Sequence, residues 1–342
     1  MKNSFVFISN AFGGIKTFQD TLIKFITKME IDCILIDEKP FKIFKKKKLK
    51  HHKINVLRKI FSTFTILKKI KNENVNKRTI FIFSNPVIFF IYFLYIKLSY
   101  NNKKIFFFAH SHLTKKSIML YLCSLISTIF FIYINKIFYV SRFTKKYWEK
   151  IYFFPKFTRS SIQYNSVIFL KKINKINNKK FRIGFVGRIE KEKGLKKFLE
   201  IAYENKNNFT FNIFSDNKLN LNNSQKKYVQ FFFNKNVTTI YENIDLLLVT
   251  SPIENCPFSV LEAKRYGIPT LIYFTKGGVS EIIENNQDGI IMNADKKKLK
   301  IADCINKIKV NYKFFSSNAY RNARKYNADI EIPRLIKNEL IK

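Results

Sequence analysis

The chain has 342 residues, enough for two domains of ordinary size, and 46% of them are hydrophobic, which indicates a globular protein rather than a disordered one. A net charge of +39 suits nucleic acid or an anionic membrane as a partner. However, Lys, Asn, Ile and Phe are all abundant, as expected from a genome rich in A and T, and such a base composition also accounts for many lysines. No nucleic-acid-binding motif accompanies this charge, which argues against nucleic acid as a partner.

Cysteines and histidines indicate neither disulfides nor a metal site. The four cysteines show no paired spacing and are expected to pack as small apolar side chains in a reducing cytoplasm: Cys33, Cys123, Cys256 and Cys304. None of the four histidines lies in a metal-ligand pattern with acids or cysteines. We therefore predict a protein without a bound metal.

The chain begins with a predicted strand, turn, helix and strand. Phe5 to Ile8 form a short apolar run, too short and too soon interrupted to be a signal peptide. Gly13 and Gly14 follow, and their bare backbone can approach a phosphate. The next helix has apolar residues at helical spacing, namely Phe18, Leu22, Phe25, Ile26 and Met29. With a second strand at Cys33 to Ile36, this β-α-β unit predicts a parallel sheet.

Residues 42–78 are rich in Lys and Arg and contain a single acid, Glu73. Apolar residues form one helical stripe within this segment: Ile54, Leu57, Phe61, Phe64 and Leu67. Such a basic amphipathic helix either lies on an anionic membrane surface or packs against the core with a solvated face. Both interpretations stay open, and the first predicts a peripheral membrane contact through residues 42–72.

Two further apolar stretches precede the middle of the chain. Ser84-Asn85-Pro86 marks the end of a strand at Thr79 to Phe83 and the start of a helix. Ile118 to Ile134 has no charge for seventeen residues, but it contains serines, a threonine and tyrosines and is short for a bilayer span. We predict a buried or membrane-leaning helix there, followed by a strand at residues 136–140.

A pair of histidines follows the predicted strand Ile105 to Ala109. The carboxyl end of a parallel strand faces the ligand side of such a sheet, so His110 is a candidate site residue. A loop histidine bonded to backbone is the alternative, and His112 is a neighbour without an assigned role. The first domain is predicted to cover residues 1–172, ending with Tyr164 to Val167, and a polar linker covers residues 173–180.

The second domain is predicted over residues 181–328 and opens with a strand, a cationic loop and a helix. Arg188 and Lys193 lie in this loop, between the strand end and the helix start, where a diphosphate would be held. Further elements are a strand at Phe209 to Phe214, a helix at Lys296 to Val310 and a last helix from Pro333, taken as a first-turn proline.

The stretch Ile244 to Glu284 predicts the centre of this second domain. A buried strand at Leu246 to Val249 leads into a loop with Glu254, and a helix from about Pro257 to Tyr266 stops at Gly267. Glu262 lies inside that helix, and its long side chain leans back toward the helix start, which favours anions. We expect the two carboxylates to bind hydroxyls of a ligand whose phosphates rest on backbone amides.

Three patterns occur in a fixed order: Gly-Arg-x4-Lys-Gly, Glu-x7-Glu and Gly-Gly-Val-x-Glu. Across residues 181–290 they resemble the retaining glycosyltransferases of family 4, among the group 1 glycosyltransferases. Weaker agreement at Gly13-Gly14, Ala109-His110, Val140-Ser141 and residues 165–167 extends the likeness over most of the chain. The resemblance implies an α/β protein of the GT-B fold, with two Rossmann-like domains whose parallel sheets face each other across a cleft. It also implies a C-terminal helix, residues 329–342, that crosses back to the first domain.

The same resemblance implies roles for individual residues. Arg188 and Lys193 would clamp the donor diphosphate, Glu262 would bond the ribose, and Glu254 would contact the transferred sugar. His110 matches the histidine beside the reacting centre. Backbone amides near five further residues would help to hold phosphate or sugar: Gly13, Gly14, Cys256, Phe258 and Ser259. Ser215-Asp216-Asn217 replaces the glycine-containing turn of many relatives, so the donor base is left open.

We therefore expect a retaining, metal-independent hexosyltransferase without a cofactor. It would move sugar from a nucleotide-diphosphate donor to a saccharide acceptor, expected to be lipid-linked, in bacterial surface polysaccharide assembly, as for O-antigen, capsule or lipopolysaccharide. The expected location is the cytoplasm, free or on the inner face of the membrane. The alternatives are a non-catalytic protein of this fold that binds a nucleotide sugar or a membrane partner, and an epimerase of this fold.

Overall fold

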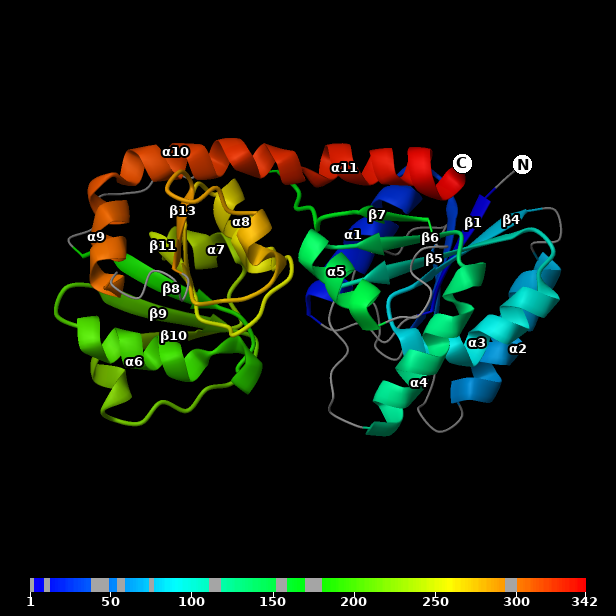
Figure 1. Cartoon of the computed structure of the whole chain (residues 1–342), viewed down its shortest axis with the longest axis horizontal. Coiled ribbons are helices and arrows are strands. Elements are labelled where there is room, and N and C mark those ends of the chain that lie inside the picture. The colour runs from blue at the N-terminus through cyan, green and yellow to red at the C-terminus, as the bar shows by residue number, and fades with distance from the viewer. Residues whose placement is uncertain are drawn as a thin grey trace. The chain divides into compact units, whose positions relative to one another are not determined.

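The computed structural model describes residues 3–8, 13–37, 49–53, 59–73, 77–110, 118–151, 159–169, 180–292 and 300–342. The chain divides into two compact units (Figure 1). Unit 1 combines Met1–Tyr164 with Ile330–Lys342, and unit 2 is Asn165–Asp329.

Residues 165–169 belong to unit 2, although the sequence placed them in a first domain ending at residue 172. The reason is a set of hydrogen bonds within unit 2. The Val167 N–H donates to the Tyr326 carbonyl at 2.9 Å, and the Asn165 side chain donates to the Cys256 carbonyl at 2.7 Å. Of the expected linker, residues 173–180, only Lys180 lies among the described residues.

Unit 1 contains a parallel sheet with seven strands among the described residues. They are β1 (Asn3–Ile8), β2 (Asp32–Asp37), β3 (Leu49–Lys53), β4 (Arg78–Phe83), β5 (Lys103–Ala109), β6 (Lys136–Tyr139) and β7 (Ser160–Ile162). Their order is β3-β2-β1-β4-β5-β6-β7. The chain thus extends the sheet from β1 first in one direction and then in the other, as in a doubly wound fold. Sequence periodicity missed the edge strands β3 and β7.

Helices lie between most of the successive strands of unit 1. They are α1 (Gly14–Lys28), α2 (Lys59–Glu73), α3 (Pro86–Ser99), α4 (Ile118–Ile129), the short 3-10 helix η2 (Phe130–Tyr133) and α5 (Arg142–Ile151). The Asn85 side chain accepts from the N–H groups of Val87 and Ile88, and Pro86 occupies the first helical position. This cap confirms the helix start predicted from Ser84-Asn85-Pro86.

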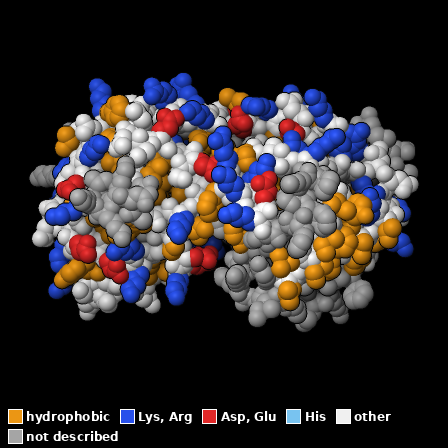
Figure 2. Space-filling view, in the orientation of Figure 1, with side chains coloured by type: hydrophobic (Ala, Val, Ile, Leu, Met, Phe, Trp, Pro, Cys, Tyr) orange, Lys and Arg blue, Asp and Glu red, His pale blue; other side chains and the backbone are white. Residues whose placement is uncertain are grey.

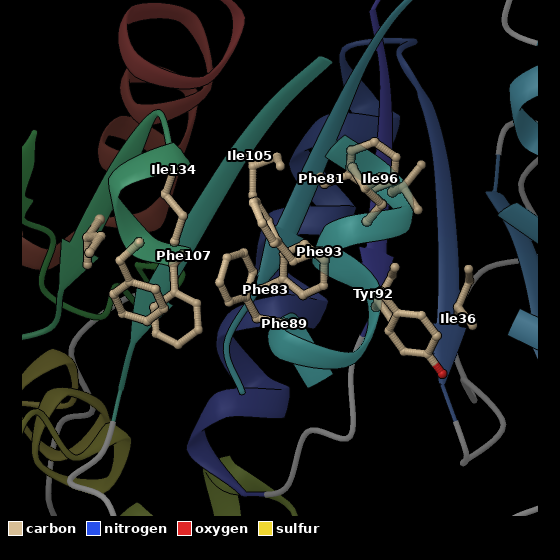
Figure 3. Close-up of a cluster of buried hydrophobic side chains, with 14 of the residues drawn as sticks. Ile36, Phe81, Phe83, Phe89, Tyr92, Phe93, Ile96, Ile105, Phe107 and Ile134 are labelled. Atoms are coloured by element: carbon tan, nitrogen blue, oxygen red, sulfur yellow. The ribbon is translucent and has the colours of Figure 1, made fainter. Parts of the chain in front are cut away.

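Phenylalanines dominate the core between α3 and the central strands. Phe89, Phe93 and Ile96 of α3 pack against Phe81, Phe83 and Phe107 of the sheet, and all six are buried (Figure 3). Because side chains alternate between the two faces of a strand, Phe81 and Phe83 point to the same helix layer. This packing fixes the sheet whose carboxyl ends carry His110.

The basic segment 42–78 contains both β3 and α2. Leu67 and Ile70 are buried in the core, and Phe64 packs edge-on against Tyr92 at 5.4 Å, so these apolar residues face the protein. Lys68 and Lys69 on the other side of α2 are exposed. Residues 42–48 and 54–58, with the predicted stripe positions Ile54 and Leu57, lie outside the described residues. The described part of the stripe therefore packs against the core.

The uncharged stretch Ile118 to Ile134 forms α4 and η2, followed by β6, in agreement with the predicted helix and strand. Among the residues that the structure describes, no helix has the length and apolar character needed to cross a membrane. Ser127 is buried, whereas Leu122, Ile126 and Ile129 are exposed. This helix therefore covers the core with one side only.

Unit 2 contains a second parallel sheet. Its strands are β8 (Arg182–Val186), β9 (Thr210–Ser215), β10 (Val229–Phe233), β11 (Leu246–Val249), β12 (Thr270–Tyr273) and β13 (Gly289–Met292). The order β10-β9-β8-β11-β12-β13 repeats the doubly wound arrangement of unit 1. The predicted α/β class with two Rossmann-like parallel sheets is confirmed.

The helices of the remaining chain are α6 (Leu195–Asn205), α7 (Val237–Glu242), α8 (Phe258–Arg265), α9 (Ile301–Val310), α10 (Tyr312–Ala323) and α11 (Ala328–Leu335). A π-helical segment, Ile336–Ile341, continues α11. Pro333 lies inside α11, so its prediction as a first-turn residue was wrong. The helix begins five residues earlier because Asn327 caps it: its side chain accepts from the Asp329 N–H at 3.0 Å.

Candidate functional site

The candidate site of unit 2 lies where the direction of strand order reverses, between β8 and β11. These two strands are neighbours, but the chain leaves β8 toward β9 and leaves β11 toward β12. Loops that follow such strands separate at the carboxyl edge of the sheet and leave room for a ligand. The loop after β8 carries Arg188 and Lys193, and the loop after β11 carries Glu254.

Hydrogen bonds join these two loops. The Thr250 hydroxyl donates to the Gly194 carbonyl at 2.9 Å, and the Ser251 hydroxyl lies 3.3 Å from the Lys193 carbonyl. Gly194 has a φ of +71°, and a Cβ at this position would overlap the Thr250 carbonyl. Only glycine combines this conformation with so close an approach, which explains the glycine of the Gly-Arg-x4-Lys-Gly pattern.

Lys193 and Glu254 form the central pair of the site. The Lys193 Nζ lies 2.6 Å from the Glu254 Oε1, and the side chains of Lys193 and Glu254 are 27% and 13% exposed, respectively. The Ser251 hydroxyl donates to the same carboxylate oxygen at 2.9 Å. Together with Pro257 and Ser259 they line a small cavity of about 30 Å³. The structure thus brings together one cation and one acid that lie 61 residues apart in the sequence.

The backbone of Glu254 is held as firmly as its side chain. Its N–H donates to the Lys276 carbonyl at 2.9 Å, and its carbonyl accepts from the Val279 N–H at 3.1 Å. Gly277, at a φ of +111°, packs so closely that a Cβ would overlap the Glu254 carbonyl. The Gly-Gly-Val segment therefore serves as a backbone support for Glu254.

Arg188 is placed differently from Lys193. Its guanidinium bonds the Glu190 carboxylate at 2.6 Å and lies 3.7 Å from that of Glu192, while 41% of its side chain is exposed. Such exposed ion pairs contribute little to stability because water and salt screen them. The guanidinium can therefore exchange these acids for an anionic ligand at low cost.

Glu262 lies in the second turn of α8. Its Oε2 is 3.0 Å from the Tyr241 hydroxyl, which is also 3.0 Å from the Ser259 carbonyl and can donate to either. Burial raises the pKa of Glu262 above its usual value, and the charge of Arg265 and the hydrogen bond from Tyr241 act in the opposite direction. Tyr241 itself is fully buried, so it fixes the position of this carboxylate.

The start of α8 supplies backbone amides. Pro257 is the N-cap and Phe258 the first helical residue, close to the predicted start. Cys256 is buried, and burial raises the pKa of its thiol to about 12, so the thiol stays neutral. The backbone carbonyl of Cys256 accepts the Asn165 hydrogen bond. Cys256 thus contributes packing and backbone position.

A buried ion pair holds the other end of α8. The Lys264 Nζ lies 2.7 Å from the Asp288 Oδ2, both side chains are at most 1% exposed, and Asn322 donates to the same Asp288 oxygen at 2.9 Å. Lys264 also donates to the Ile282 carbonyl. This network fastens α8 to the turn before β13 and to α10. The sequence signal for it was a lysine among the apolar residues Val260, Leu261 and Ala263.

In unit 1, His110 follows β5 and is only 9% exposed. Its ring lies 4.7 Å from that of Phe18 and 6.3 Å from that of Phe108. Burial lowers the pKa of His110 to about 3, so the imidazole is neutral at physiological pH. His112 lies outside the described residues.

Gly13 and Gly14 are exposed at the start of α1, and Gly13 is its N-cap with a φ of 52°. They and His110 belong to unit 1, whereas the other predicted site residues belong to unit 2: Arg188, Lys193, Glu254, Cys256, Phe258, Ser259 and Glu262.

Sequence reasoning missed three contributors to the site. Ser251 was visible only as a polar residue after a strand, and Tyr241 lies in a short helix without a motif. Gly277 belongs to the Gly-Gly-Val-x-Glu pattern, but no local feature of the sequence shows that it touches Glu254. Among the described residues there is no cluster of three or more His, Cys, Asp or Glu able to hold a metal ion.

Comparison with known families matches residues 167–328 to the model described as glycosyl transferases group 1. A protein of Klebsiella pneumoniae, described as an uncharacterized 41.2 kDa protein in the cps region, is 28% identical over 171 residues. That match covers 46% of this chain and 48% of the Klebsiella protein, so it spans about half of that relative's length.

Solved structures resemble the chain over nearly its whole length. HepE of Anabaena in complex with UDP-glucose has a TM-score of 0.76 at 12% identity, with 98% of each chain covered. The lipopolysaccharide outer core galactosyltransferase WaaB has a TM-score of 0.73 at 19% identity, covering 99% of this chain and 98% of WaaB. At such low identity the likeness concerns the fold alone, and it confirms the predicted GT-B fold.

Proposed function

We propose that this chain, whose residues 167–328 match the model of the group 1 glycosyltransferases, transfers a sugar from a nucleotide-diphosphate donor to a saccharide acceptor. The observation that carries this proposal is the Lys193–Glu254 pair at 2.6 Å, at the point where strand order reverses in unit 2. It combines a cation suited to phosphate with a carboxylate suited to sugar hydroxyls.

The donor diphosphate is assigned to Arg188 and Lys193. When the bond between the sugar and the diphosphate breaks, negative charge grows on the leaving oxygen, and fixed cations stabilise it. Arg188 offers a planar fork that suits two phosphate oxygens, and Lys193 offers a compact charge. The amides of Phe258 and Ser259 at the start of α8 supply further donors.

The two carboxylates are assigned to hydroxyl groups of the donor. Glu262 would accept hydrogen bonds from the ribose, because Tyr241 and the helix hold its side chain in place. Glu254 would contact the transferred sugar, which gains positive character in the transition state. Both acids then position the donor, and neither acts as a strong base.

We propose retention of the anomeric configuration by attack on the face that the diphosphate leaves. The acceptor oxygen forms the new bond to the anomeric carbon, the bond to the diphosphate breaks, and a phosphate oxygen of the leaving group takes the acceptor proton. His110 is assigned to this reaction by resemblance, and its neutral imidazole suits a hydrogen bond rather than a charge. Gly13 and Gly14 are assigned to backbone contacts with phosphate or sugar.

The acceptor class is proposed from the relatives. The Klebsiella protein is described as lying in a cps region, and WaaB is described as acting on the lipopolysaccharide outer core. We propose a lipid-linked saccharide acceptor in bacterial surface polysaccharide assembly, reached from the cytoplasm with peripheral membrane contact. HepE is in complex with UDP-glucose, so a UDP-sugar is the first donor to test.

The test is a screen of the purified protein against UDP-, ADP-, GDP- and TDP-sugars by thermal unfolding. A true donor at 100 times its Kd stabilises the protein by about 2.7 kcal/mol. The stabilising donor is then incubated with saccharide acceptors, and the anomeric configuration of the product is read by NMR. Stabilisation without transfer or hydrolysis would indicate a protein that only binds nucleotide sugar, and an inverted product would refute the retaining mechanism.

We further propose that transfer needs no metal ion, since Arg188 and Lys193 supply the charge that a metal would supply to the diphosphate. The rate should then be unchanged within a factor of about two after treatment with EDTA, compared with a Mg²⁺-supplemented sample. A rate that falls with EDTA and returns with Mg²⁺ would refute this assignment.

A further inference from the structure

One side of α3, α4 and η2 in unit 1 exposes large apolar side chains. Leu98 is 81% exposed, and the others are between 46% and 55% exposed. We call this the α3–α4 face and define it by Leu94, Leu98, Leu122, Ile126, Ile129 and Ile132. Figure 2 shows hydrophobic side chains gathered over these helices.

The α3–α4 face is continuous because the two helices pack against each other. The Phe130 ring lies 5.9 Å from that of Phe90 and 5.1 Å from that of Phe93. Leu94 and Leu98 are one helical turn apart on α3, and the exposed residues of α4 follow each other at spacings of four and three. Soluble proteins seldom expose so many neighbouring aliphatic side chains without a partner.

The stretch of chain that carries the α3–α4 face has charged residues of a single sign. Between Glu73 and Glu149 the sequence has no Asp or Glu, but it has eleven Lys and Arg. Exposed Lys97 lies on α3 between Leu94 and Leu98, and its Nζ is 4.7 Å from the centre of the Tyr133 ring. An apolar surface with cations beside it and no acids in that stretch of chain is complementary to an anionic surface that has an apolar interior.

We propose that the α3–α4 face binds the surface of an anionic phospholipid bilayer. The aliphatic side chains enter the boundary between headgroups and acyl chains, and Lys97 and neighbouring lysines contact the phosphates. α4 has 12 residues, fewer than the roughly 20 that span a bilayer, so it lies in the interface and does not cross.

This surface differs from the contact through residues 42–72 that the sequence suggested. The described apolar residues of α2, Phe64, Leu67 and Ile70, pack against the core, whereas those of α3 and α4 are exposed. Membrane binding by this face does not depend on sugar transfer, because it is inferred only from the exposed apolar side chains and from the positive charge of the lysines in this stretch of chain.

The test measures co-sedimentation of the full chain with vesicles of phosphatidylcholine and with vesicles of equal parts phosphatidylglycerol and phosphatidylcholine. The variant L98E/I126E places two carboxylates on the α3–α4 face. The matched control V310E/F314E changes two large residues of α9 and α10 in unit 2, which are 82% and 50% exposed. Circular dichroism and thermal unfolding test whether each variant folds, which we expect because all four positions are exposed.

We expect binding to the anionic vesicles, weaker binding to phosphatidylcholine, and a loss of affinity as NaCl rises from about 0.05 to 0.5 M. The L98E/I126E variant should bind the anionic vesicles at least about tenfold more weakly, because two aliphatic contacts are lost and two negative charges added. The V310E/F314E control should bind like the unmodified chain.

Three results would overturn the proposal. One is equal loss of binding in the face variant and in the control, and another is no binding to anionic vesicles at low salt. The third is a dimer in analytical ultracentrifugation that L98E/I126E converts to a monomer while vesicle binding is unchanged. That result would assign the α3–α4 face to a second copy of the chain.

Discussion

Arg188 and Lys193 lie in one loop, but the structure gives them different surroundings. Lys193 is held between Glu254 and the backbone bonds of Thr250 and Ser251, whereas Arg188 is half exposed and pairs with acids of its own loop. A cation that is not committed to the fold is the better ligand for a diphosphate that arrives and leaves. At the scale of single residues, Arg188 is thus the most informative position.

The Arg188→Ala variant should lose roughly 30- to 1000-fold in kcat/KM for the preferred donor, equivalent to about 2 to 4 kcal/mol of transition-state stabilisation. Steady-state kinetics with the true substrates measures this loss. Lys191→Ala removes an exposed cation from the same loop and should change kcat/KM less than about threefold. Near-normal turnover of Arg188→Ala would show that the guanidinium does not stabilise the transition state.

Burial of His110 makes stability depend on pH. The pKa of His110 is lowered to about 3 in the folded chain, while an unfolded histidine has a pKa of about 6.5. Between these values the unfolded chain binds more protons, so the stabilisation is present above pH 6.5 and is lost as the pH falls toward 3. From pH 7.5 to 5.5 the loss from this residue should be about 1.4 kcal/mol.

Urea unfolding of the chain and of His110→Gln at both pH values measures this contribution. His51, His52 and His112 are shared by the two proteins, so the difference between their pH dependences isolates His110. The variant should lose less stability on acidification. Equal losses in both proteins would mean that His110 is solvated in the folded state.

At the scale of elements, short backbone supports decide where Glu254 lies. The Lys276 carbonyl, Gly277 and the Val279 N–H all contact the backbone of Glu254, although they follow the next strand, β12. The loop after β11 and the turn after β12 are thereby one structural piece. The Glu-x7-Glu and Gly-Gly-Val patterns occur together because one holds the other.

Gly277→Ala should therefore destabilise unit 2 by at least about 2 kcal/mol, since alanine at a φ of +111° is strained and its Cβ overlaps the Glu254 carbonyl. For a unit of this size, the thermal midpoint should fall by about 4 to 8 °C. In Gly187→Ala the new Cβ would meet only the Phe185 ring at 3.9 Å, so that midpoint should stay within about 1 °C. An unchanged midpoint for Gly277→Ala would show that the turn can relax.

Helices and buried strands were predicted well where their signals are local. Asn85 and Pro86 predict the start of α3, and the apolar run Leu246–Val249 predicts β11. Edge strands such as β3, with the sequence Leu-Lys-His-His-Lys, have no apolar alternation, so only their pairing in the sheet reveals them. β10 at the edge of the second sheet was also missed, although its sequence, Val-Gln-Phe-Phe-Phe, is largely apolar.

At the scale of the whole molecule, the C-terminal segment belongs to unit 1. Ile332, Leu335, Ile336 and Leu340 are buried. Lys136 pairs with Glu339 at 2.6 Å, and the Arg78 guanidinium donates to the Ile341 carbonyl at 3.0 Å. Residues from the two ends of the sequence therefore stabilise one unit.

Deletion of residues 330–342 should cost unit 1 at least about 5 kcal/mol, because four aliphatic side chains leave the core and expose their partners. That loss approaches the whole stability of an ordinary domain, so we expect aggregation or rapid proteolysis of residues 1–164. Limited proteolysis and soluble yield measure it. Glu339→Gln removes only the partly exposed ion pair and should cost less than about 1 kcal/mol. A soluble, protease-resistant deletion variant would show that unit 1 folds without the segment.

The sequence by itself determined the α/β class, the two parallel sheets and the order of the three motifs, because periodicity and turn residues are local properties of the chain. Only the tertiary structure decided which groups meet. The pairing of Lys193 with Glu254, the support of Glu262 by Tyr241 and the burial of the Lys264–Asp288 pair join residues that are far apart in sequence. The exposure of the α3–α4 face was equally invisible, since an apolar helix has the same sequence pattern whether its outer side meets protein or solvent.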